Sequence, residues 1–438
     1  MVLFKNFKNI FSISELRRKI LYTLGVLVVY RLGSFIPVIG VNLFLLRDYM
    51  ERASGVGGLL GYLDIFSGGS LRQCTLFALG ISPYITASIM MQLLSMIIPS
   101  LEQLAKEGDY GRRIINQYTR YLTLGLSVFY SLTYAALLES QGLVLTPGLG
   151  FKLTFVVSLT VGALFVMWLG EQLSLYGIGV NGSSLIIFAG IVARLPKDIA
   201  QTGRLVSIGT VDPVIAISLL VIFILVTACI IFLERGERKI PVQYARRVVG
   251  HRMYGGQSAY IPFKINTAGI MPVIFAGSIL HVPQYLIYIL AGRFDFFKKI
   301  SHIFTYSGFV YSMLDFCLII FFSFFYTALM YNPTELADNI KKSGGFIPGL
   351  RPGKKTAQFF DYILTRIGLV GAVYLGLLAV LPNIVYRFAQ VPFSLGGTSM
   401  LIMVGVALET SAQIDSYLID HRYEGFLSSG RVKGRSAR

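Results

Sequence analysis

The chain has 438 residues, of which 54% are hydrophobic and only 14% are charged, and its mean hydropathy is +0.66. Soluble domains carry about 25% charged residues, so this composition excludes an ordinary soluble domain and predicts a polytopic membrane protein. The net charge of +17 at pH 7 is therefore interpreted first as a signal of membrane topology.

Ten apolar runs are candidates for membrane spans, since a hydrocarbon core of about 30 Å requires about 20 apolar residues in a helix. No small-residue cleavage site follows the first run, so we expect it to be an anchor rather than a removed signal peptide. The fold class that we expect is an all-α membrane protein of ten transmembrane helices. The runs lie near 20–40, 75–99, 121–140, 153–170, 183–193, 212–233, 265–290, 309–331, 367–385 and 397–416.

The fifth run is the doubtful one, because its apolar part, Leu185 to Ala193, is too short to span alone. Either the polar segment Gly177 to Ser184 continues the helix, or that segment lies in a wet cavity at membrane depth. Both alternatives remain open from the sequence.

The stretch from Gly55 to Pro99 combines a complete span with a weaker element. Thr75 to Pro99 is long and apolar enough to cross a bilayer, whereas Val56 to Phe66 carries three glycines and then meets the break Ser67 to Ser70. Each glycine costs about 1 kcal/mol relative to Ala in a helix interior. Broken helices at membrane depth are tolerated only where they are buried in protein or line a water-filled cavity. The stretch predicts a half-helix beside a path through the protein, and an ordinary loop is the alternative.

The distribution of Lys and Arg predicts which way the chain crosses the membrane. An even number of spans puts both termini on one side, and the segments on that side carry 27 Lys and Arg residues against 11 on the other. The positive-inside rule then makes both termini cytoplasmic. The expected organisation is a cytoplasmic segment 1–19, an N-terminal half 20–196, a C-terminal half 212–416 with cytoplasmic loops 234–264 and 332–366, and a basic tail 417–438.

An internal repeat supports two related halves. The pattern G-I-x-P-x-I-x-A occurs at Gly80–Ala87 and at Gly269–Ala276, in the second span of each five-span half. Five is an odd number of spans, so the two copies would cross the membrane in opposite directions. This arrangement is typical of an inverted repeat, in which the site of action lies near the midplane between the halves.

Isoleucines are the candidate functional residues at the midplane. Ile81 and Ile85 share a helix face because they are four residues apart, and Ile187 and Ile191 repeat that spacing in the fifth span. The second copy of the pattern carries Ile270 and Ile274. A constriction of bulky apolar side chains can block ions by dewetting. Simple packing or lipid contact is the alternative for any single isoleucine.

Ionisable groups are few within the spans, which argues against a proton or ion relay. The candidates are Arg31, Asp315 and Glu409, and none of them belongs to the repeated pattern. Arg31 is costly at a helix centre, so we expect it near an end or with a partner. The two acids are interpreted as polar contacts between helices. The three cysteines and four histidines lack metal-ligand spacing, so no metal site, disulfide framework or cofactor is expected.

Two large basic loops differ from the rest of the chain. Glu234–Arg252 and Lys341–Lys355 mix Lys and Arg with turn residues and apolar residues, and the Pro and Gly residues of the second loop would present Arg351 at a tip. They are either ordinary solvated cytoplasmic loops or a docking surface for a large anionic partner such as ribosomal RNA, or for an acidic protein face. The candidate docking residues are Arg235, Arg238, Lys239, Arg246, Arg247, Arg351, Lys354 and Lys355.

These features together resemble the SecY family, the main subunit of the bacterial protein-conducting channel, over nearly the whole chain. One departure is an extra residue before Asn181, where the family usually has G-x-G-N-G. The matching stretches are RLGSFIPVIG (31–40), FSGG (66–69), FALGISPYITASI (77–89), KEGDYGRRIINQYTRY (106–121), MWLGEQ (167–172), IIFAGIVA (186–193), ERGERKIPVQYARR (234–247), ADNIKKSGGFIPGLRPG (337–353) and GGTSMLI (396–402).

The resemblance implies two inverted five-helix halves around a central hourglass pore, with a short plug half-helix, roughly Val56 to Ser70, that closes the pore from the outer side. It also implies a gate between spans two and three on one side and seven and eight on the other. The pore ring implied by position consists of Ile81, Ile85, Ile187, Ile191, Ile274 and Ile402. The plug residues are Val56, Gly57, Gly58, Leu59, Leu60, Gly61, Phe66, Ser67, Gly68 and Gly69.

The resemblance further implies partners and a location. The partners are the SecE and SecG subunits, the SecA ATPase, the ribosome with its RNA and proteins, secretory polypeptides with signal sequences, and the lipid bilayer. The location is the bacterial cytoplasmic membrane. The sequence holds no G-x-x-x-x-G-K-[ST] loop, so we expect a passive gated channel that is not an enzyme and is driven by a partner. The rival class is a secondary transporter, which would need a coupling carboxylate at the midplane.

Overall fold

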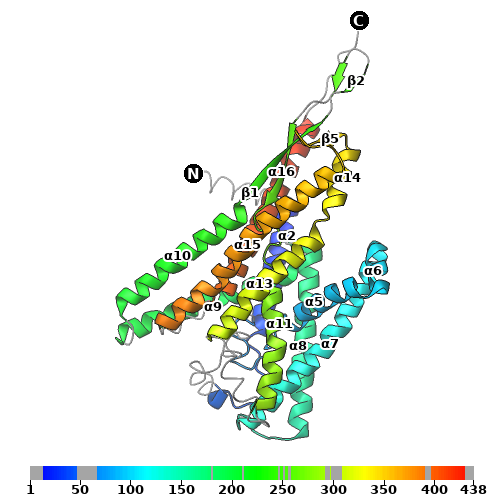
Figure 1. Ribbon diagram of the computed structural model, residues 1–438. Coiled ribbons are helices and arrows are strands. Elements are labelled where there is room, and N and C mark those ends of the chain that lie inside the picture. Colours follow the sequence, from blue (N-terminus) through cyan, green and yellow to red (C-terminus); the bar gives the residue numbers. More distant parts are fainter. Residues whose placement is uncertain are drawn as a thin grey trace. The chain divides into compact units, whose positions relative to one another are not determined.

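The computed structural model describes residues 13–46, 67–178, 181–209, 212–244, 247–249, 252–254, 258–291, 296, 308–389 and 396–429. Helices dominate these residues, with two small antiparallel sheets (Figure 1). Several expectations fall outside them: the plug from Val56 to Phe66, the candidate docking residue Arg246, the extra residue near Val180, and most of the N-terminal segment and the final tail.

The helices follow one another along the chain and differ greatly in length. They are α2 (Ser14–Gly33), α5 (Ser82–Ile97), α6 (Pro99–Lys106), α7 (Asp109–Ser140), α8 (Leu149–Tyr176), α9 (Gly182–Ser207), α10 (Pro213–Arg235), α11 (Met271–Ala291), α13 (Phe309–Met330), α14 (Pro333–Lys342), α15 (Lys354–Ala389) and α16 (Gly397–Ser429). The strands are β1 (Glu237–Tyr244), β2 (Arg247–Val249), β3 (Arg252–Tyr254), β4 (Ser258–Lys264) and β5 (Gly345–Phe346).

A helix lies at each of the ten expected spans, and six stretches of the described chain are long and apolar enough to cross a membrane. A seventh is added if α5 and α6, which meet at a bend of 102°, count as one broken span. The six lie within α7, α8, α10, the α13–α14 stretch, α15 and α16. The chain is therefore a multi-pass membrane protein, whereas the count of ten spans stays a prediction.

Two of the expected spans differ from the sequence interpretation. The helix of the second span begins only at Ser82, and residues 67–81 form turns. Gly80 has a positive φ of 55°, which a regular helix does not allow, so the helix cannot extend back through it. The fifth helix begins at Gly182 and continues past Pro196 to Ser207. It therefore gains its length at its C-terminal end, in residues that the sequence interpretation assigned to a loop.

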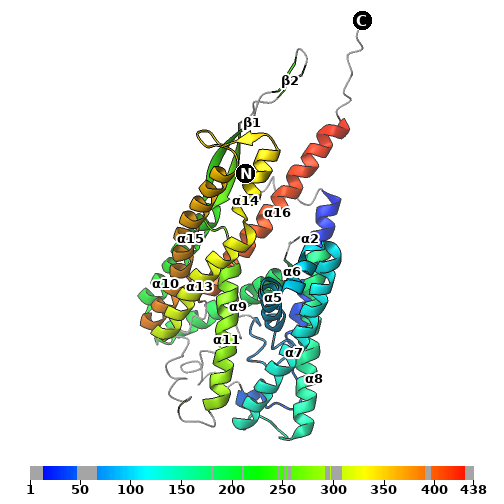
Figure 2. The same cartoon turned by 45° about the vertical axis from the view of Figure 1, so that its right-hand side comes forward.

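The chain divides into two compact units. Among the described residues, one holds 13–46, 67–194 and 406–429, and the other holds those between 195 and 405. In the first unit α7 packs against α5 and α8, and α2 packs against α8. In the second unit α13 packs against α11 and α15, while α10 and α14 pack against α15 (Figure 2). Each unit thus has its own helical core.

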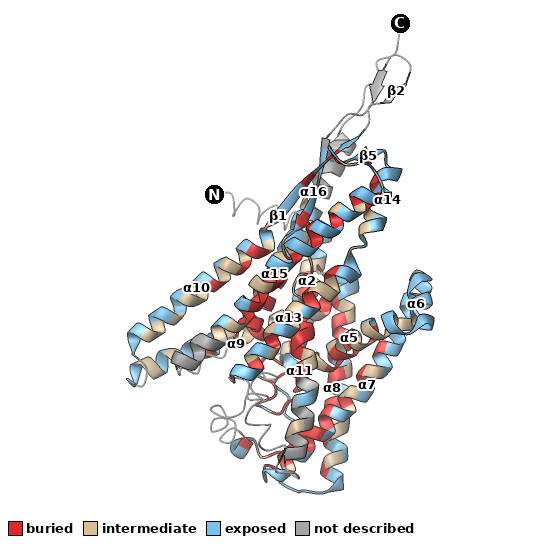
Figure 3. Cartoon of the chain, in the orientation of Figure 1, coloured by how far each residue is buried: buried red, intermediate tan, exposed pale blue. Residues whose placement is uncertain are grey.

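Helix α10 is the least covered of the apolar helices. Only 11% of its apolar stretch is buried, against half of the corresponding stretch in α7, α8, α15 and α16. Figure 3 shows intermediate and exposed residues along most of its length. Water would make such a surface costly, so this face is suited to lipid or to the helix of another subunit.

Candidate functional site

Both copies of the repeated pattern begin a helix at the same position. Gly80 and Gly269 have φ values of 55° and 62°, the left-handed region that favours glycine. Helix α5 then starts at Ser82 and α11 at Met271, each two residues after its glycine. Proline occupies the second helical position in both, where its missing N–H leaves no intrahelical bond unmade. The pattern therefore encodes one local structure twice.

The similarity between the copies extends to the helices beside them. Leu76 and Ile265 each lie four residues before the glycine of their copy. A Cβ added at Gly162 of α8 would overlap the carbonyl oxygen of Leu76, and one at Gly371 of α15 would lie 2.5 Å from the carbonyl oxygen of Ile265. The segment that leads into each repeated helix therefore needs a glycine on the helix that it crosses. The packing of α5, α7 and α8 in one unit accordingly matches that of α11, α13 and α15 in the other.

The six candidate ring isoleucines are found on four helices. Within the first unit, Ile81 caps the start of α5 with Ile85 in its first turn, and α9 carries Ile187 and Ile191. All of these are buried except Ile85, which is half-buried. Within the second unit, Ile274 on α11 and Ile402 on α16 are also buried. The helix positions follow the sequence spacing, and the role of the ring stays a prediction.

Ile270 belongs to the repeated pattern but packs differently from Ile274. Its Cδ1 atom lies against Gly405 of α16, where a Cβ would meet it. Ile81, at the matching position of the first copy, has its Cδ1 atom 3.2 Å from the place of a Cβ on Gly170 of α8. The first isoleucine of the pattern therefore anchors its helix in both units.

The described end of the predicted plug is firmly held within the first unit. Arg31 of α2 donates from Nη1 to the carbonyl oxygen of Gly68 at 3.2 Å. A Cβ on Gly68, whose φ is 67°, would lie 2.9 Å from Cα of Gly190 in α9. Ser67 and Gly68 are buried. The expectation that Arg31 lies near a helix end or has a partner is thus confirmed, since it is in the last turn of α2 and bonds to Gly68. Gly68 itself packs closely on α9.

The turns between Gly68 and α5 are held by backbone bonds to the segment leaving α2. Val38 donates to the carbonyl of Cys74 at 2.9 Å, and Leu76 donates to that of Ile36 at 2.8 Å. Tyr134 of α7 donates from its hydroxyl to the carbonyl of Leu71 at 3.1 Å. Backbone groups buried without regular structure need such partners. The turns before α5 are therefore a fixed part of the first unit.

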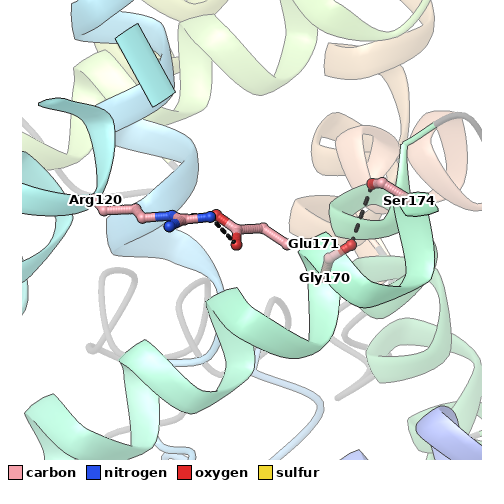
Figure 4. A network of polar contacts seen from close by, with 4 residues as sticks. All are labelled: Arg120, Gly170, Glu171 and Ser174. Atoms are coloured by element: carbon pink, nitrogen blue, oxygen red, sulfur yellow. Dashed lines mark hydrogen bonds and ion pairs between the residues drawn. The ribbon is translucent and has the colours of Figure 1, made fainter. Parts of the chain in front are cut away.

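Side-chain contacts tie α7, α8 and α9 together on this unit. Arg120 of α7 binds Glu171 of α8 through two parallel hydrogen bonds, from Nε at 2.9 Å and from Nη2 at 2.7 Å (Figure 4). One turn further along α8, Ser174 donates to the carbonyl of Gly170 at 3.1 Å and accepts from the amide of Gly182 at 2.8 Å. Gly182 is the first residue of α9, so this hydrogen bond attaches the beginning of α9, the fifth expected span, to α8.

The two basic loops form one packed module, which the sequence did not predict. Strand β1 pairs with β4 along most of its length, and its end pairs with β5, so that Gln243 faces Phe346 and Tyr244 faces Gly345. We call β1, β4, β5, α14 and residues 347–364 the docking module. Its core consists of Ile240, Val242, Phe263, Ala337, Ile340, Ile347, Phe360, Ile363 and Leu364.

Arg351 lies between two Pro-Gly turns of this module. In the first, Leu350 donates to the carbonyl of Ile347 at 3.1 Å around Pro348 and Gly349, whose φ is 84°. Proline followed by a glycine with positive φ is the signature of a type II turn. Pro352 and Gly353, with φ 101°, repeat the pattern immediately afterwards. Ile347 is buried in the core, so the turns hold the exposed Arg351 beside a fixed base.

Most of the candidate docking residues point to solvent. Within the described side chains, those of Arg235, Arg238, Lys239, Arg351, Lys354 and Lys355 are exposed. Lys239 contacts Glu237 at 3.2 Å, and such exposed pairs are worth little. Arg246 and the side chain of Arg247 lie outside the described residues. The module thus presents cations from two distant parts of the chain on one small fold.

Comparisons with known proteins agree with this architecture. The SecY family model matches residues 75–411. The protein translocase subunit SecY of Escherichia coli (strain K12) is 44% identical over 429 residues, covering 97% of this chain and 96% of that protein. The chain belongs to the SecY family. Two solved structures share the fold at 18% and 17% identity and cover 95% of both chains: a protein-conducting channel, with a TM-score of 0.65, and Sec61 in the canine ribosome-channel complex from the endoplasmic reticulum, with a TM-score of 0.61.

Membership of the SecY family indicates the function of the chain as a whole. This SecY-family chain is a channel subunit of protein translocation, and its apolar helices place it in a membrane.

Proposed function

We propose that this chain is the central, passive pore of the Sec translocon in a bacterial cytoplasmic (inner) membrane. It passes unfolded secretory polypeptides and releases transmembrane segments laterally into lipid, with SecE and SecG as companion subunits and SecA or the ribosome as the source of energy. Family membership over nearly the whole chain carries this proposal. Both termini are assigned to the cytoplasm because Lys and Arg gather in alternate loops.

The proposed waist is the ring of six isoleucines. Four helices contribute to it, and five of the six side chains are buried, as expected of a dry constriction that stops ions by dewetting. The proposed lateral gate separates α5 and α7 from α11 and α13. In support, each of these pairs packs together inside a single unit.

The decisive test of the waist is a crosslink to a polypeptide in transit. A single cysteine replaces Ile85 in a background without Cys74, Cys229 and Cys317, and a secretory chain with one cysteine is stalled in transit and oxidised. Cys74→Gly suits that position because its φ is 45°. The control is a cysteine at Ile217, which is 65% exposed on α10. A disulfide at residue 85 and none at 217 is expected, and the reverse would contradict the proposed waist.

The proposed docking site of SecA and the ribosome is the basic module around Arg351. A solved relative has been seen in a ribosome-channel complex, and exposed Lys and Arg suit RNA phosphates or an acidic protein face. Arg351→Glu is expected to weaken binding of SecA and of ribosomes by about tenfold, because one contact turns from attraction to repulsion. Lys106→Glu, an equal charge change at an exposed residue of α6, is the control. Equal binding by both variants would contradict this docking site.

A further inference from the structure

The docking module continues directly into the helix that carries one of the ring isoleucines. Strand β4 ends at Lys264, and α11 begins at Met271. The six residues between them contain Asn266, whose side chain is only 3% exposed. A buried amide needs partners for its polar atoms, and these partners define the junction.

Asn266 forms hydrogen bonds to residues both earlier and later in the chain. Its Nδ2 atom donates to Oε1 of Glu234 at 2.7 Å and to the carbonyl oxygen of Gly269 at 3.0 Å. Both partners are acceptors, so the amide nitrogen, with its two hydrogens, is the atom that fits here. Glu234 lies at the end of α10, and Gly269 lies two residues before α11. One side chain therefore connects the end of one helix to the beginning of the next.

The neighbouring residues hold this junction on three other elements. Ile265 donates from its amide to the carbonyl of Gly236 at 2.8 Å. Its own carbonyl lies against Gly371 of α15. The Thr267 hydroxyl is 2.8 Å from that of Thr327 on α13. Residues 265 and 267 are thus held against the rest of the second unit. Asn266, between them, is the next residue but one after β4, so a displacement of that strand is felt there early.

Gly269 is the joint that the amide controls. Its φ is 62°, and no atom lies within 4 Å of the place a Cβ would occupy, so the space beside its backbone is open and the bond from Asn266 to its carbonyl oxygen helps to hold it. Ile274 comes soon after it, with its amide bonded to the carbonyl of Ile270 at 3.3 Å. Without that bond the chain could turn at Gly269 between β4 and α11, whereas the bond from Asn266 links the start of α11 to the end of the strand.

We propose that Asn266 is a positioning residue that transmits movement of the docking module to α11, through its paired hydrogen bonds to Glu234 and Gly269. This inference rests on the proposed docking of a motor or ribosome at the module. Arg238 and Lys239 pair in register with Phe263 and Pro262 of β4, so a load on the docking residues reaches Asn266 within one strand. Coupling of this kind is a difference in free energy between two states of the joint.

The test replaces the amide with an acid of the same shape in the full channel complex, reconstituted in vesicles. Asn266→Asp removes the donor to both acceptors and sets a carboxylate against Glu234. Binding of SecA and resting ion leak are expected to stay at the parental level, while SecA-driven transport falls about tenfold. A merely structural role would lower all of these together with the yield of folded protein.

Two further variants sharpen the result. Asn332→Asp is the same chemical change at the residue that caps α14, an exposed side chain whose Oδ1 atom accepts hydrogen bonds from the amide and the hydroxyl of Thr334, and it should transport normally. Adding Glu234→Gln to Asn266→Asp restores a donor–acceptor pair of reversed polarity and should recover part of the transport, since the bond to Gly269 stays broken. Recovery of transport with unchanged binding of SecA supports the positioning role.

Failure of the inference and failure of the docking proposal look different. If Asn266→Asp transports at the parental rate while SecA still binds the module, Asn266 transmits nothing and the inference is overturned. Loss of transport in Asn332→Asp to the same extent would overturn it as well. If SecA binds Arg351→Glu as tightly as the parent, the docking site itself is wrong, whatever Asn266 does.

Discussion

The two copies of the repeated pattern start their helices alike but are approached by very different chains. Before Gly80, the chain runs as buried turns fixed by bonds to α2 and α7. Before Gly269, it runs as a strand of an exposed basic sheet. The same helix start thus receives a fixed, buried approach in one unit and an approach from the docking module in the other.

Under the proposed function, this difference lets one pattern serve two tasks, a resting seal and a response to a partner. A start that is tied into its own unit suits a helix that must keep a resting seal, since Arg31 and Gly190 hold Gly68, where the described turns that lead to the helix begin. A helix start that is connected to a solvent-exposed sheet suits a helix that must respond to a partner. The resting seal and the response can then be damaged separately by substitutions at one approach or the other.

The largest effects are expected at the glycines that the two approaches cross. Gly162→Ala and Gly371→Ala each force a methyl group onto a backbone carbonyl, and overpacking of this kind costs about 1–3 kcal/mol or more. The closer approach at Gly162 predicts the larger loss there. Thermal unfolding of the purified complex in detergent measures it, with loss of folded protein as the extreme outcome.

The controls for these glycines lie on the same two helices. Gly150→Ala on α8 and Gly368→Ala on α15 add a methyl group where no atom lies within 4 Å. Alanine is favoured over glycine in a helix by about 0.5–1 kcal/mol, so both should be neutral or slightly stabilising. Equal midpoints for Gly162→Ala and Gly150→Ala would show that the close approach to Leu76 is not a constraint.

The next effect separates the seal from the response. Arg31→Gln removes a charged donor from the carbonyl of Gly68, and a hydrogen bond to a charged group is worth about 1.5–3 kcal/mol. We expect the resting ion leak of vesicles to rise, while SecA binding is unchanged because the docking module is untouched. A tight resting channel in this variant would mean that Gly190 alone suffices to hold the segment.

Smaller effects are expected from neutral hydroxyl groups at the two approaches. Tyr134→Phe leaves the carbonyl of Leu71 without its 3.1 Å bond, and Thr267→Val removes the contact with Thr327. Each should lower stability by about 1 kcal/mol, but Tyr134→Phe should raise leak and Thr267→Val should slow transport. Identical phenotypes would erase the distinction between the two approaches.

The smallest effect is expected from the ion pair of Figure 4. The side chains of Arg120 and Glu171 are 53% and 20% exposed, and pairs of this kind contribute about 0.2–1 kcal/mol. A double-mutant cycle with Arg120→Gln and Glu171→Gln should give a coupling energy in that range that shrinks with added salt. A coupling well above it would make the α7–α8 contact a main support of the first unit.

Much of this organisation could be predicted from local sequence. Apolar length located a helix at every expected span, and the repeated pattern located two helices that begin alike. The Pro-Gly pairs around Arg351 indicated turns, because proline and glycine fix backbone angles regardless of context. Each of these signals lies within a short stretch of sequence, and the backbone preferences of that stretch are enough to determine its structure.

The features that the sequence did not reveal depend on contacts between distant residues. Strand β5 has two residues, too few for any pattern, and it exists only because β1 offers it an edge. The turns before α5 are apolar enough to suggest a helix, yet they are held open by bonds to Ile36 and Val38. Asn266 gave no signal either. The spacing of two between the apolar residues Ile240 and Val242, which are buried on either side of the exposed Pro241, was a short hint of a strand.

The three-stranded sheet also sets an order of events during synthesis. Strands β1 and β4 are close in sequence and can pair as soon as Lys264 has been made. Strand β5 and the α14 and α15 residues that share their core come only after α11 and α13. A growing chain therefore carries a basic hairpin without its packed base until those two helices exist. The complete three-stranded sheet and its core therefore form only in chains whose α11 and α13 helices have already been made.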